Sequence, residues 1–422
     1  MTDDRYAHRR AGAAIKFTDP SGTPIADTDI AYDQVSHKFL FGCGAFDAGP
    51  ATMDIDKVPA NVPFSRDELI KMKEFSKDRV EKWLKLFNYG TLPFYWGRFE
   101  HEEGKPMTEA SMAAAKYLTS RGARIKGHPL CWHTVCADWL LKYDNETIIK
   151  KQLERINREV TDFRGVIDMW DVINAVVIMP VFDKYDNAIT RICNELGRVK
   201  LVKLVFDKAK ECNPDAVLLI NDFNLSMKYH ELIEECLDAG VPISAIGLQT
   251  HQHQGYMGRE RLEEVLDRFS DFGLPLHFTE NTLVSGHLMP PEIVDLNDYQ
   301  VDEWPSTEEG EERQRLEWKE MYEILFGSPL VEAVTAWDFA DGNWLKAPSG
   351  LIRKDSSLKP AYHELDRLIN KEWTSSGVLH TDENGYARIE GYLGDYSFDL
   401  GGNKAVIKLT KDMSAENVVR LA

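Results

Sequence analysis

The chain has 422 residues, enough for one large domain of barrel size with a smaller appendage or for two to three ordinary domains. Its composition, with 43% hydrophobic and 28% charged residues, is typical of a globular protein. The formal net charge of −19 argues against a nucleic-acid or anionic-membrane partner, because binding phosphates requires a surplus of Lys and Arg.

No apolar run approaches the length of a membrane span, and the first twelve residues, MTDDRYAHRRAG, lack the apolar segment of a secretory signal. We therefore expect a cytoplasmic protein, although a secreted chain from which the signal had been trimmed would look the same. The six cysteines are scattered without regular pairing, so we expect reduced and mostly buried thiols.

Polar and apolar residues alternate near both ends of the chain. Residues 11–38 alternate around a Pro-Ser-Gly-Thr-Pro turn, a pattern that predicts a hairpin, and residues 377–413 do the same around Glu-Asn-Gly and Gly-Gly-Asn. Neither segment alone would make a convincing core. We predict that 1–38 and 373–422 pair into one small accessory β-domain beside a larger domain at 39–372.

Within 39–372, short apolar strands alternate with amphipathic helical patterns. The predicted strands are 39–46, 86–96, 123–132, 166–174, 216–224, 244–251, 274–281 and 333–341. Asp144-Asn145-Glu146 offers capping groups for one helix, and Gly240 offers a stop for another. This alternation predicts an α/β fold, a (β/α)8 barrel (TIM barrel). The competing doubly wound open sheet would need a glycine-rich phosphate turn, which the sequence lacks.

One connection, 281–310, is too long for an ordinary loop between a strand and a helix. It leaves the carboxyl end of a predicted strand, and (β/α)8 barrels carry their active sites at that end. We therefore expect this segment to overhang the mouth of the barrel.

Polar and aromatic residues gather at the predicted carboxyl ends of the strands. They are Trp96, Arg98, His128, Trp132, His133, Asn174, Asp222, Gln249, His251, Glu280, Trp337 and Trp344. Indole rings stack on the apolar faces of sugars, while amides and imidazoles hydrogen-bond hydroxyl groups. The set therefore favours a carbohydrate site over a phosphate or nucleotide site.

Cleavage of a glycosidic bond generally requires two carboxylates, one on each side of the bond. Glu280 ends an apolar strand, where a carboxylate is a poor structural choice unless it is paired or functional. The second carboxylate should come from another strand across the barrel, and the position after Asn174 is the natural place. That position holds Ala175, whose methyl group can neither donate nor accept a proton.

Six segments in order resemble family 10 of the glycoside hydrolases, the retaining endo-β-1,4-xylanases on a (β/α)8 barrel. They are GHPLCWH (127–133), WDVINA (170–175), INDFN (220–224), GLQTH (247–251), FTEN (278–281) and AWDFADGNWL (336–345), with SGLIRKDSSLKPAYHEL (349–365) after them. The resemblance covers roughly residues 39–370. In the family, the segment equivalent to WDVINA is W-D-V-V-N-E, and its glutamate is the acid/base residue.

The resemblance implies that Glu280 is the nucleophile and that position 175 is the acid/base position. Asn174 would bind the 2-hydroxyl of the sugar at the cleavage subsite, and His251 would orient Glu280. Further sugar contacts are expected from His133, Gln249, Trp337 and Trp344 and, because of their strand-end positions, from Trp96, Arg98, His128 and Asp222.

Ala175 departs from the family, which has glutamate there. General acid–base catalysis supplies orders of magnitude in rate, so turnover should be strongly impaired. Either the chain is a natural non-catalytic sugar-binding relative, or a glutamate was deliberately changed to alanine to keep substrate intact. We favour the second interpretation, because Glu280 and Asn174 are retained and a drifting relative would have no reason to keep its nucleophile.

The second predicted strand also departs from the family, which has T-x-E-N-x-x-K-W there. This chain has TLPFYWGRFEHEEGK (91–105), without the Glu, Asn and Lys that grip the neighbouring sugar in xylanases. Phe94, Tyr95, Trp96 and Arg98 occupy the region, and some of these rings serve only packing in one interpretation. An exo-acting enzyme for a decorated oligosaccharide or a glycosylated small molecule is therefore a second hypothesis for the substrate.

No metal or organic cofactor is implied by the sequence. His251 and His253 admit a metal site as a rival, but no third ligand lies nearby in the sequence. Aldolase chemistry would need a strand-end lysine in an apolar setting, and no good candidate is present. The accessory β-domain would either stabilise the barrel or bind sugar. The expected partner is a β-linked carbohydrate.

Overall fold

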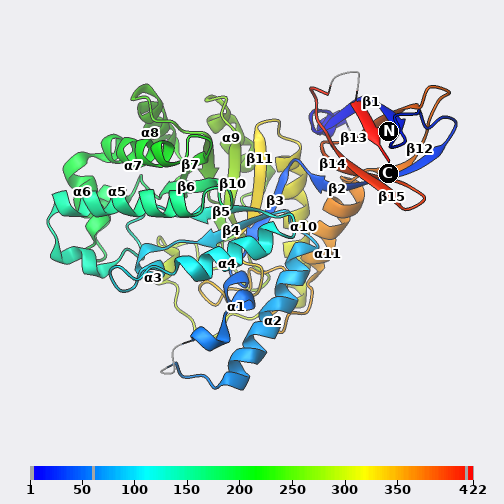
Figure 1. The fold of residues 1–422 in the computed structure, drawn as a ribbon. Helices are drawn as coiled ribbons and strands as arrows, with labels where there is room; N and C mark the ends of the chain where they lie inside the picture. Colours follow the sequence, from blue (N-terminus) through cyan, green and yellow to red (C-terminus); the bar gives the residue numbers. More distant parts are fainter. Residues whose placement is uncertain (1–3, 59–61, 414–416, 422) are drawn as a thin grey trace.

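The computed structural model describes residues 4–58, 62–413 and 417–421, so residues 1–3, 414–416 and 422 of the predicted terminal segments lie outside the described residues. A closed parallel barrel dominates the molecule (Figure 1). Its strands are β3 (Leu40–Gly44), β4 (Tyr89–Pro93), β5 (Arg124–His128), β6 (Met169–Asn174), β7 (Val217–Asp222), β8 (Ala245–Leu248), β10 (Leu276–Leu283) and β11 (Val331–Ala336). Because β11 pairs with both β10 and β3, the sheet closes, which confirms the barrel and excludes the open sheet.

Helices on the outside of the barrel follow most of the strands. They are α1 (Ala48–Thr52), α2 (Arg66–Leu84), α3 (Trp96–Phe99), α4 (Thr108–Thr119), α5 (Asn145–Asp162), α6 (Ala188–Leu196), α7 (Arg198–Cys212), α8 (Met227–Asp238), α9 (Gly258–Ser270), α10 (Glu308–Phe326) and α11 (Pro360–Arg367). Short turns of helix are η1 (Asp4–Arg9), η2 (Ile55–Lys57), η3 (Asp138–Lys142), η4 (Met179–Val181), η5 (Leu296–Asp298) and η6 (Leu368–Glu372), and β9 (His251–Gln252) extends the sheet.

Local sequence signals set the ends of these helices. Asp144 caps α5 by accepting the backbone N–H of Thr147 at 2.9 Å, as predicted. After α8, Gly240 has a φ of +74°, the left-handed conformation that commonly ends helices. Among the described residues, no helix is both long and apolar enough to cross a membrane. All six cysteines are free, and only Cys212 is not fully buried, which confirms the expectation.

The inside of the barrel changes from apolar to polar along the strands. Near the amino ends, one buried cluster fills the interior: Leu40, Tyr89, Met169, Leu219, Ala245 and Ala333. Asp171 and Asn221 stand two residues after Met169 and Leu219, at positions of the same orientation, and Lys126 stands on β5 beside them. All three polar residues are fully buried. Register shifts between Asp171 and Ile173 and between Phe278 and Asn281 then change the direction of the side chains that follow.

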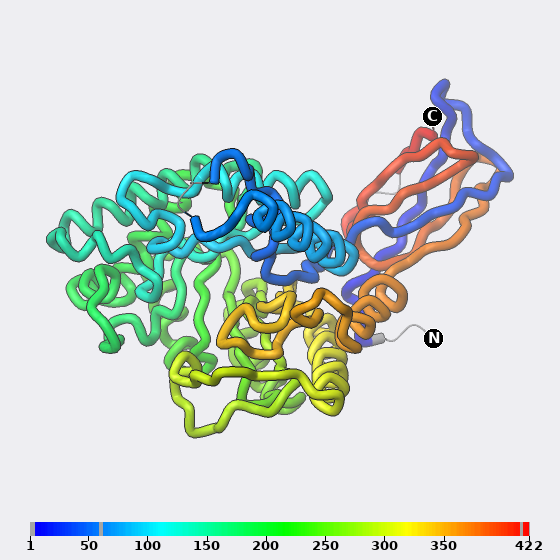
Figure 2. The backbone as a smooth tube through the Cα atoms, turned by 90° about the horizontal axis from the view of Figure 1, so that it is seen from below, coloured from blue at the N-terminus to red at the C-terminus, as the bar shows by residue number. Residues whose placement is uncertain are grey.

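The two ends of the chain build a separate two-layer unit beside the barrel (Figures 1 and 2). One sheet has the order β13–β1–β16 and the other β12–β2–β14–β15. The strands are β1 (Arg10–Thr18), β2 (Asp29–His37), β12 (Ser376–His380), β13 (Tyr386–Tyr392), β14 (Gly394–Leu400), β15 (Asn403–Leu409) and β16 (Asn417–Arg420). We call this unit the accessory sandwich. Its core joins the sheets through contacts such as that between Phe17 and Phe398, whose ring centroids are 5.1 Å apart.

The predicted pairing of the two ends is confirmed, but the predicted hairpin at 11–38 is wrong. β1 and β2 lie in different sheets and pair with C-terminal strands instead. The same holds for β12 and β13 around Glu-Asn-Gly, whereas β14 and β15 do form a hairpin at Gly401-Gly402. The alternation of polar and apolar residues shows only that a strand has one buried face. In a sandwich, the neighbouring strand can lie in either of two sheets, so alternation does not identify the pairing partner.

The accessory sandwich packs on the amino end of the barrel. The Arg9 guanidinium donates to the carbonyl oxygens of Phe326 (2.9 Å), Ser328 (2.6 Å) and Val331 (2.6 Å), where α10 ends and β11 begins. His37 Nε2 lies 3.1 Å from the carbonyl oxygen of Ile369. The carboxyl ends of the strands, at the other end of the barrel, are left free of the sandwich.

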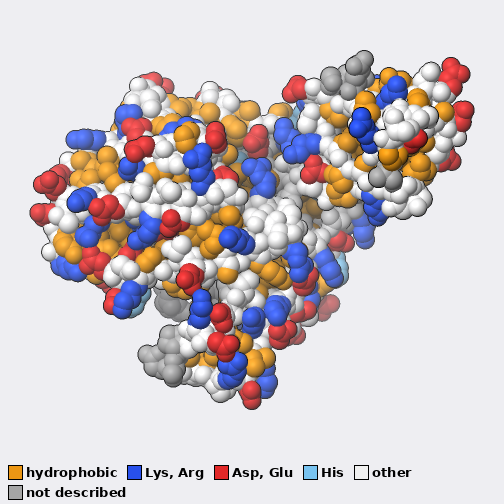
Figure 3. Space-filling view, viewed as in Figure 1, with side chains coloured by type: hydrophobic (Ala, Val, Ile, Leu, Met, Phe, Trp, Pro, Cys, Tyr) orange, Lys and Arg blue, Asp and Glu red, His pale blue; other side chains and the backbone are white. Residues whose placement is uncertain are grey.

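Charged side chains of both signs are interspersed over the face shown in Figure 3. Several charged side chains among the described residues form ion pairs within one helix, such as Lys82 with Asp78 at 2.6 Å and Arg259 with Glu263 at 3.2 Å. Exposed pairs of this kind contribute little to stability. The net negative charge therefore reflects a general surplus of carboxylates rather than one acidic patch on this face.

Candidate active site

Glu280 lies on β10 at the carboxyl end of the barrel and is only 4% exposed. Its Oε1 accepts a hydrogen bond from Asn221 Nδ2 at 2.8 Å, and its Oε2 lies 3.2 Å from His251 Nε2. Burial raises the pKa of Glu280, but the nearby His128 and the hydrogen bond from His251 lower it by more, so the net pKa is below its usual value. The carboxylate is therefore held ionised, as a nucleophile requires.

Beneath Glu280, buried charged groups form a chain across the inside of the barrel. His128 Nε2 lies 3.7 Å from Glu280 Oε1, and His128 Nδ1 lies 2.7 Å from Asp171 Oδ2. The same Asp171 oxygen lies 2.6 Å from the ammonium group of Lys126. Burial raises the pKa of Asp171, but Lys126 and His128 lower it by more. The chain fixes the orientation of the His128 ring next to Glu280.

Amide groups surround Glu280 on the side of β6. Asn174 Oδ1 accepts hydrogen bonds from Asn221 Nδ2 at 3.0 Å and from Gln249 Nε2 at 2.5 Å. Asn221 Oδ1 in turn accepts one from Thr279 Oγ1 at 2.7 Å. Because its acceptor is already used, Asn174 keeps its NH₂ group to offer to a hydroxyl group of a ligand.

Ala175 follows β6 directly, as the sequence predicts for the acid/base position. Its φ is +52°, a conformation that costs a non-glycine residue about 1–3 kcal/mol and that clusters at functional sites. The Ala175 N–H donates to the carbonyl oxygen of Asn221 at 2.9 Å, which holds the backbone in place. The position is thus rigidly placed beside the amide groups, but it carries only a methyl group.

Asp222 supports the segment after Ala175 from below. Its Oδ2 accepts the N–H of Val177 at 2.9 Å, its Oδ1 accepts that of Asn224 at 2.8 Å, and it is fully buried. Burial raises the pKa of Asp222 to about 6, although these N–H groups oppose the rise. The structure therefore places Asp222 against backbone amides, whereas its predicted role is to contact the substrate.

Tryptophan and histidine rings flank the site on the side of β11. Trp337 packs edge-on against His128, with ring centroids 5.3 Å apart, and Trp344 lies 4.7 Å from His251. The Trp344 indole donates to Asn297 Oδ1 at 3.3 Å. Asn297 belongs to the long segment 281–310, so this segment reaches over the mouth of the barrel, as predicted.

The end of β4 differs from the predicted strand 86–96. The strand stops at Pro93, and Trp96 opens the short helix α3, so its side chain turns outward rather than toward the mouth. The Trp96 indole donates to Glu100 Oε2 at 3.1 Å and packs on Trp139, with centroids 5.7 Å apart. The structure thus places Trp96 in the packing between helices, away from the other candidates.

Tyr95 takes the place near the site that Trp96 was expected to fill. Its ring centroid lies 5.6 Å from those of both His128 and Trp132, and the exposed Arg98 lies 5.7 Å above the same ring. His133 follows Trp132 and packs at a tilt against Phe182, with ring centroids 4.4 Å apart. Burial lowers the pKa of His133 to about 4, so this ring is neutral at pH 7.

Sequence reasoning missed four residues of this arrangement: Lys126, Asp171, Asn221 and Tyr95. A charged or amide side chain within an otherwise apolar barrel strand was the available signal for the first three. For Tyr95, the signal was the Pro93 that ends the strand.

Among the described residues, His128, Asp171 and Glu280 are the group whose possible metal-ligand atoms lie within 4.8 Å of one another. These atoms already contact each other, and Lys126 supplies a positive charge at Asp171. The arrangement is therefore accounted for by the protein's own groups. His251 and His253, the rival metal pair, instead pack against Trp344.

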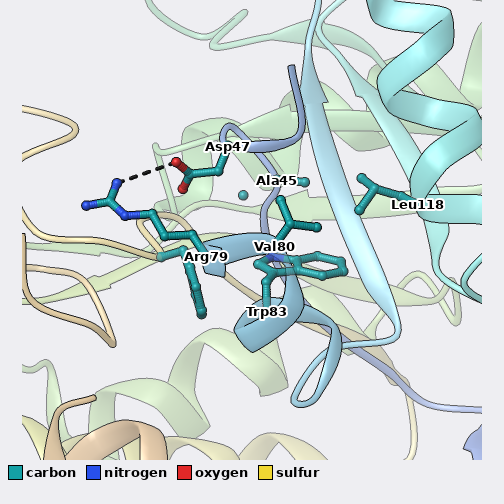
Figure 4. Close-up of a pocket in the computed structure, with 8 residues that line it drawn as sticks. Ala45, Asp47, Arg79, Val80, Trp83 and Leu118 are labelled. Carbon is teal, nitrogen blue, oxygen red and sulfur yellow. Dashed lines mark hydrogen bonds and ion pairs between the residues drawn. The ribbon is translucent and has the colours of Figure 1, made fainter. Parts of the chain in front are cut away.

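A small cavity of about 10 Å³ lies apart from these residues, between β3 and α2 (Figure 4). Arg79 Nη1 lies 3.4 Å from Asp47 Oδ1 beside it, while Val80, Trp83 and Leu118 supply apolar lining. It has room for about one water molecule. It is not a substrate site.

A (β/α)8 barrel with a buried carboxylate, amides, imidazoles and indoles at the carboxyl ends of its strands has the groups that a glycoside hydrolase requires. Residues 94–367 match the family model described as glycosyl hydrolase family 10. The chain belongs to this family, which confirms the resemblance found in the sequence.

Individual relatives agree with the family. The chain is 29% identical over 241 residues to a beta-1,4-xylanase of Dictyoglomus thermophilum, covering 54% of this chain and 64% of that protein. It is 24% identical over 405 residues to the anti-sigma-I factor RsgI6 of Acetivibrio thermocellus, covering 92% and 44%. The chain spans less than two thirds of the length of both relatives.

A solved structure supports the fold. The family 10 structure from Paenibacillus barcinonensis superimposes with a TM-score of 0.61 at 22% identity and covers 79% of this chain and 96% of that one. At this identity the likeness concerns the architecture. It agrees with the closed barrel.

Proposed function

We propose that this family 10 protein is a retaining β-glycoside hydrolase for a xylan-type or related β-linked glycan, present as an acid/base-deficient variant. Glu280 attacks the anomeric carbon, and a glutamate at position 175 in the parent protonates the leaving oxygen and later activates water. The ionised, buried state of Glu280 between Asn221 and His251 is the observation that supports this assignment most strongly.

The intact surroundings of position 175 favour a replaced glutamate. Asn174, Asn221 and Gln249 still bond to one another, and the Ala175 backbone is held in a strained conformation. A protein that had lost its chemistry would gain nothing from maintaining that strain. We also propose that 39–372 is the catalytic unit, with 1–38 and 373–422 as an accessory unit that stabilises it.

Restoring the carboxyl group tests the proposal. Ala175→Glu should raise the release of reducing sugar from a panel of β-glycans by about 10²–10⁴-fold, the contribution typical of general acid–base catalysis. Ala175→Gln is the matched control, because it restores the size of the side chain without the proton. If both variants are equally inert on every glycan and on every unactivated aryl β-glycoside, the assignment of position 175 fails.

An activated aryl glycoside tests Glu280 separately in the present chain. Its leaving group departs without a proton donor, so the glycosyl-enzyme should form and then persist for want of a base. Azide needs no base, so it should attack this intermediate and yield a β-glycosyl azide, because two inversions retain the configuration. An α-glycosyl azide, or none, would contradict the role of Glu280.

A second candidate function is sugar binding without catalysis. Ala175 favours it directly, and one relative that covers 92% of this chain is named as an anti-sigma factor rather than an enzyme. Calorimetry with β-linked oligosaccharides distinguishes the two. Binding by the present chain combined with an inert Ala175→Glu variant would favour the sugar-binding protein.

A further inference from the structure

The position of the acid/base residue shows where the leaving group must lie. An acid at position 175 has to reach the glycosidic oxygen, so the group attached to that oxygen lies against the segment that follows Ala175. This inference rests on the proposed function. The segment concerned is 176–187, which joins β6 to α6. Its composition therefore indicates what kind of leaving group the site accepts.

Segment 176–187 presents apolar and aromatic side chains to solvent. Ile178 is 37% exposed, Val181 67% and Tyr185 46%. Phe182 packs edge-on against Tyr185, with ring centroids 4.8 Å apart. Phe223, at the carboxyl end of the neighbouring strand β7, is 48% exposed. The segment also exposes Asp183, Lys184 and Asp186, and Lys184 is engaged by Asp295 and Asp298. The exposed rings are the part of this surface on which a flat ligand can stack.

These rings continue inward to the nucleophile. From Phe182, the neighbouring ring is His133 at 4.4 Å, followed by Trp132 at 6.1 Å and Tyr95 at a further 5.6 Å. Tyr95 in turn lies 5.6 Å from His128, which is 3.7 Å from Glu280. One line of aromatic rings therefore joins the exposed segment to the reacting centre.

Two polar atoms along this line have no hydrogen-bond partner among the described residues. They are the indole nitrogen of Trp132 and Nδ1 of His133, both buried. Buried polar atoms are normally paired, so these two are exceptions within the line of rings. Protein atoms enclose both of them, so the contact that this line offers to a ligand is stacking on its rings.

An ion-pair bridge limits the size of the leaving group. Lys184, in segment 176–187, lies 2.6 Å from both Asp295 and Asp298. These aspartates belong to the long segment after β10, so the bridge arches over the carboxyl ends of β7 and β8, which lie between β6 and β10 in the barrel. A polysaccharide that continued past the cleavage point would have to pass this bridge.

We propose that the leaving group of the substrate is a planar aromatic group, so that the substrate class is aryl β-glycosides rather than a continuing sugar chain. In the first step, a bond forms between a Glu280 oxygen and the anomeric carbon. The bond from that carbon to the aryl oxygen breaks, and its electron pair leaves on the aryl oxide, which takes a proton from water. An aryl oxide is a better leaving group than a sugar alkoxide, so it depends less on the acid at position 175.

Calorimetry on the present chain tests this substrate class. The ligands are matched phenyl and methyl 1-thio-β-glycosides of xylose, glucose, galactose and arabinose, in which sulfur keeps the bond intact, together with xylobiose. For each sugar whose thioglycosides bind, the phenyl thioglycoside should bind at least about tenfold more tightly than the methyl thioglycoside, because binding buries the phenyl ring. It should also bind more tightly than xylobiose. Equal affinities, or tighter binding of xylobiose, would overturn the inference.

Variants locate the effect. Phe182→Ala and Tyr185→Ala should each reduce the preference for phenyl and leave methyl glycoside binding unchanged, whereas Tyr386→Ala on the accessory sandwich should change neither. Equal losses for phenyl and methyl glycosides would mean that the rings only order the site, and this result would contradict the proposal. Lys184→Ala should strengthen xylobiose binding relative to phenyl glycoside binding, because the bridge is opened.

The azide reaction distinguishes a failure of the aryl substrate class from a failure of the hydrolase assignment. If azide yields a β-glycosyl azide but no phenyl preference exists, the aryl substrate class fails and the hydrolase assignment stands. If no azide product forms and none of the glycosides binds, the proposed function fails, and the aryl substrate class fails with it.

Discussion

The side-chain amide of Asn221 donates to Glu280 at 2.8 Å, while the backbone carbonyl of the same asparagine accepts the N–H of Ala175 at 2.9 Å. One residue of β7 therefore contacts both Glu280, the proposed nucleophile, and Ala175, the proposed acid/base position. The close packing at this point also requires Gly247, because a Cβ there would lie 2.4 Å from Asn221 Oδ1. Asn221 on β7 thus ties Glu280 on β10 and Ala175 after β6 to one residue.

Asn221→Asp should raise the pKa of Glu280, because it places a second carboxylate against the first. We expect the acidic limb of the pH profile for aryl oxide release by the present chain to move to higher pH by about one unit. Asn221→Ala is the control, because it removes the hydrogen bond without adding charge. It should slow release by about 10–100-fold, with a smaller shift of the limb. Superimposable profiles for all three proteins would contradict this role of Asn221.

Lys126→Met should destabilise the protein by about 3–5 kcal/mol, because it leaves Asp171 buried without its charged partner. The free energy of unfolding in urea measures this loss. The additional change Asp171→Leu should recover part of it, since it removes the unpaired charge. The net pKa of Asp171 lies below its ordinary value, so the pairing stabilises the fold above about pH 4 and is lost as pH falls through the lowered pKa. A Lys126→Met protein of unchanged stability would contradict the pairing.

His277 should make the fold sensitive to acid. Burial, helped by the charge of Lys126, lowers its pKa from 6.5 to about 3, so the unfolded chain binds a proton that the folded chain refuses. Above pH 6.5, His277 is neutral in both the folded and the unfolded chain and does not reduce the free energy of unfolding. As the pH falls from 6.5 toward 3, the unfolded chain takes up the proton and the free energy of unfolding decreases. His277→Leu should therefore reduce the loss of unfolding free energy between pH 7 and 4.5 by about 2 kcal/mol. The exposed His101, changed to Leu, should give no such reduction.

Arg9→Ala should loosen the accessory sandwich from the barrel, because three carbonyl oxygens lose their donor. We expect a loss of about 1–3 kcal/mol of stability. Hydrogen exchange should accelerate more in β1 and β13 than in the barrel strands. Arg10→Ala is the matched control, because Arg10 packs on the Tyr392 ring at 4.6 Å. Uniform acceleration across both units would indicate that they unfold together.

The barrel could be predicted from the sequence because its strands are apolar on both faces and alternate with helices. Glu280 and position 175 were predicted to lie at strand ends for the same reason. It was harder to predict whether a residue near a strand end points into the mouth of the barrel or outward toward the helices. Trp96 and Tyr95 are neighbours, and the turn after Pro93 decides which of them faces the mouth.

Buried charges were the second difficulty. Lys126 and Asp171 stand in apolar strands, and the pairing of β5 with β6 brings them together at 2.6 Å. The exchange of strands in the accessory sandwich was the third. β1 pairs with β13, and this choice depends on contacts between residues more than 370 apart, such as Ile15 and Ala387. Periodicity within one segment contains no information on such a partner.

The parallel pairing of β1 with β16, which aligns Ile15–Thr18 with Asn417–Arg420, bears on how the molecule responds to force. A pull applied to the two ends of the chain would slide these strands past each other and load all their hydrogen bonds at once, in shear. The tension would run through β1 and β16 and bypass the barrel between them. If the protein is held at one end and pulled at the other, the barrel therefore carries no tension until the hydrogen bonds between β1 and β16 break.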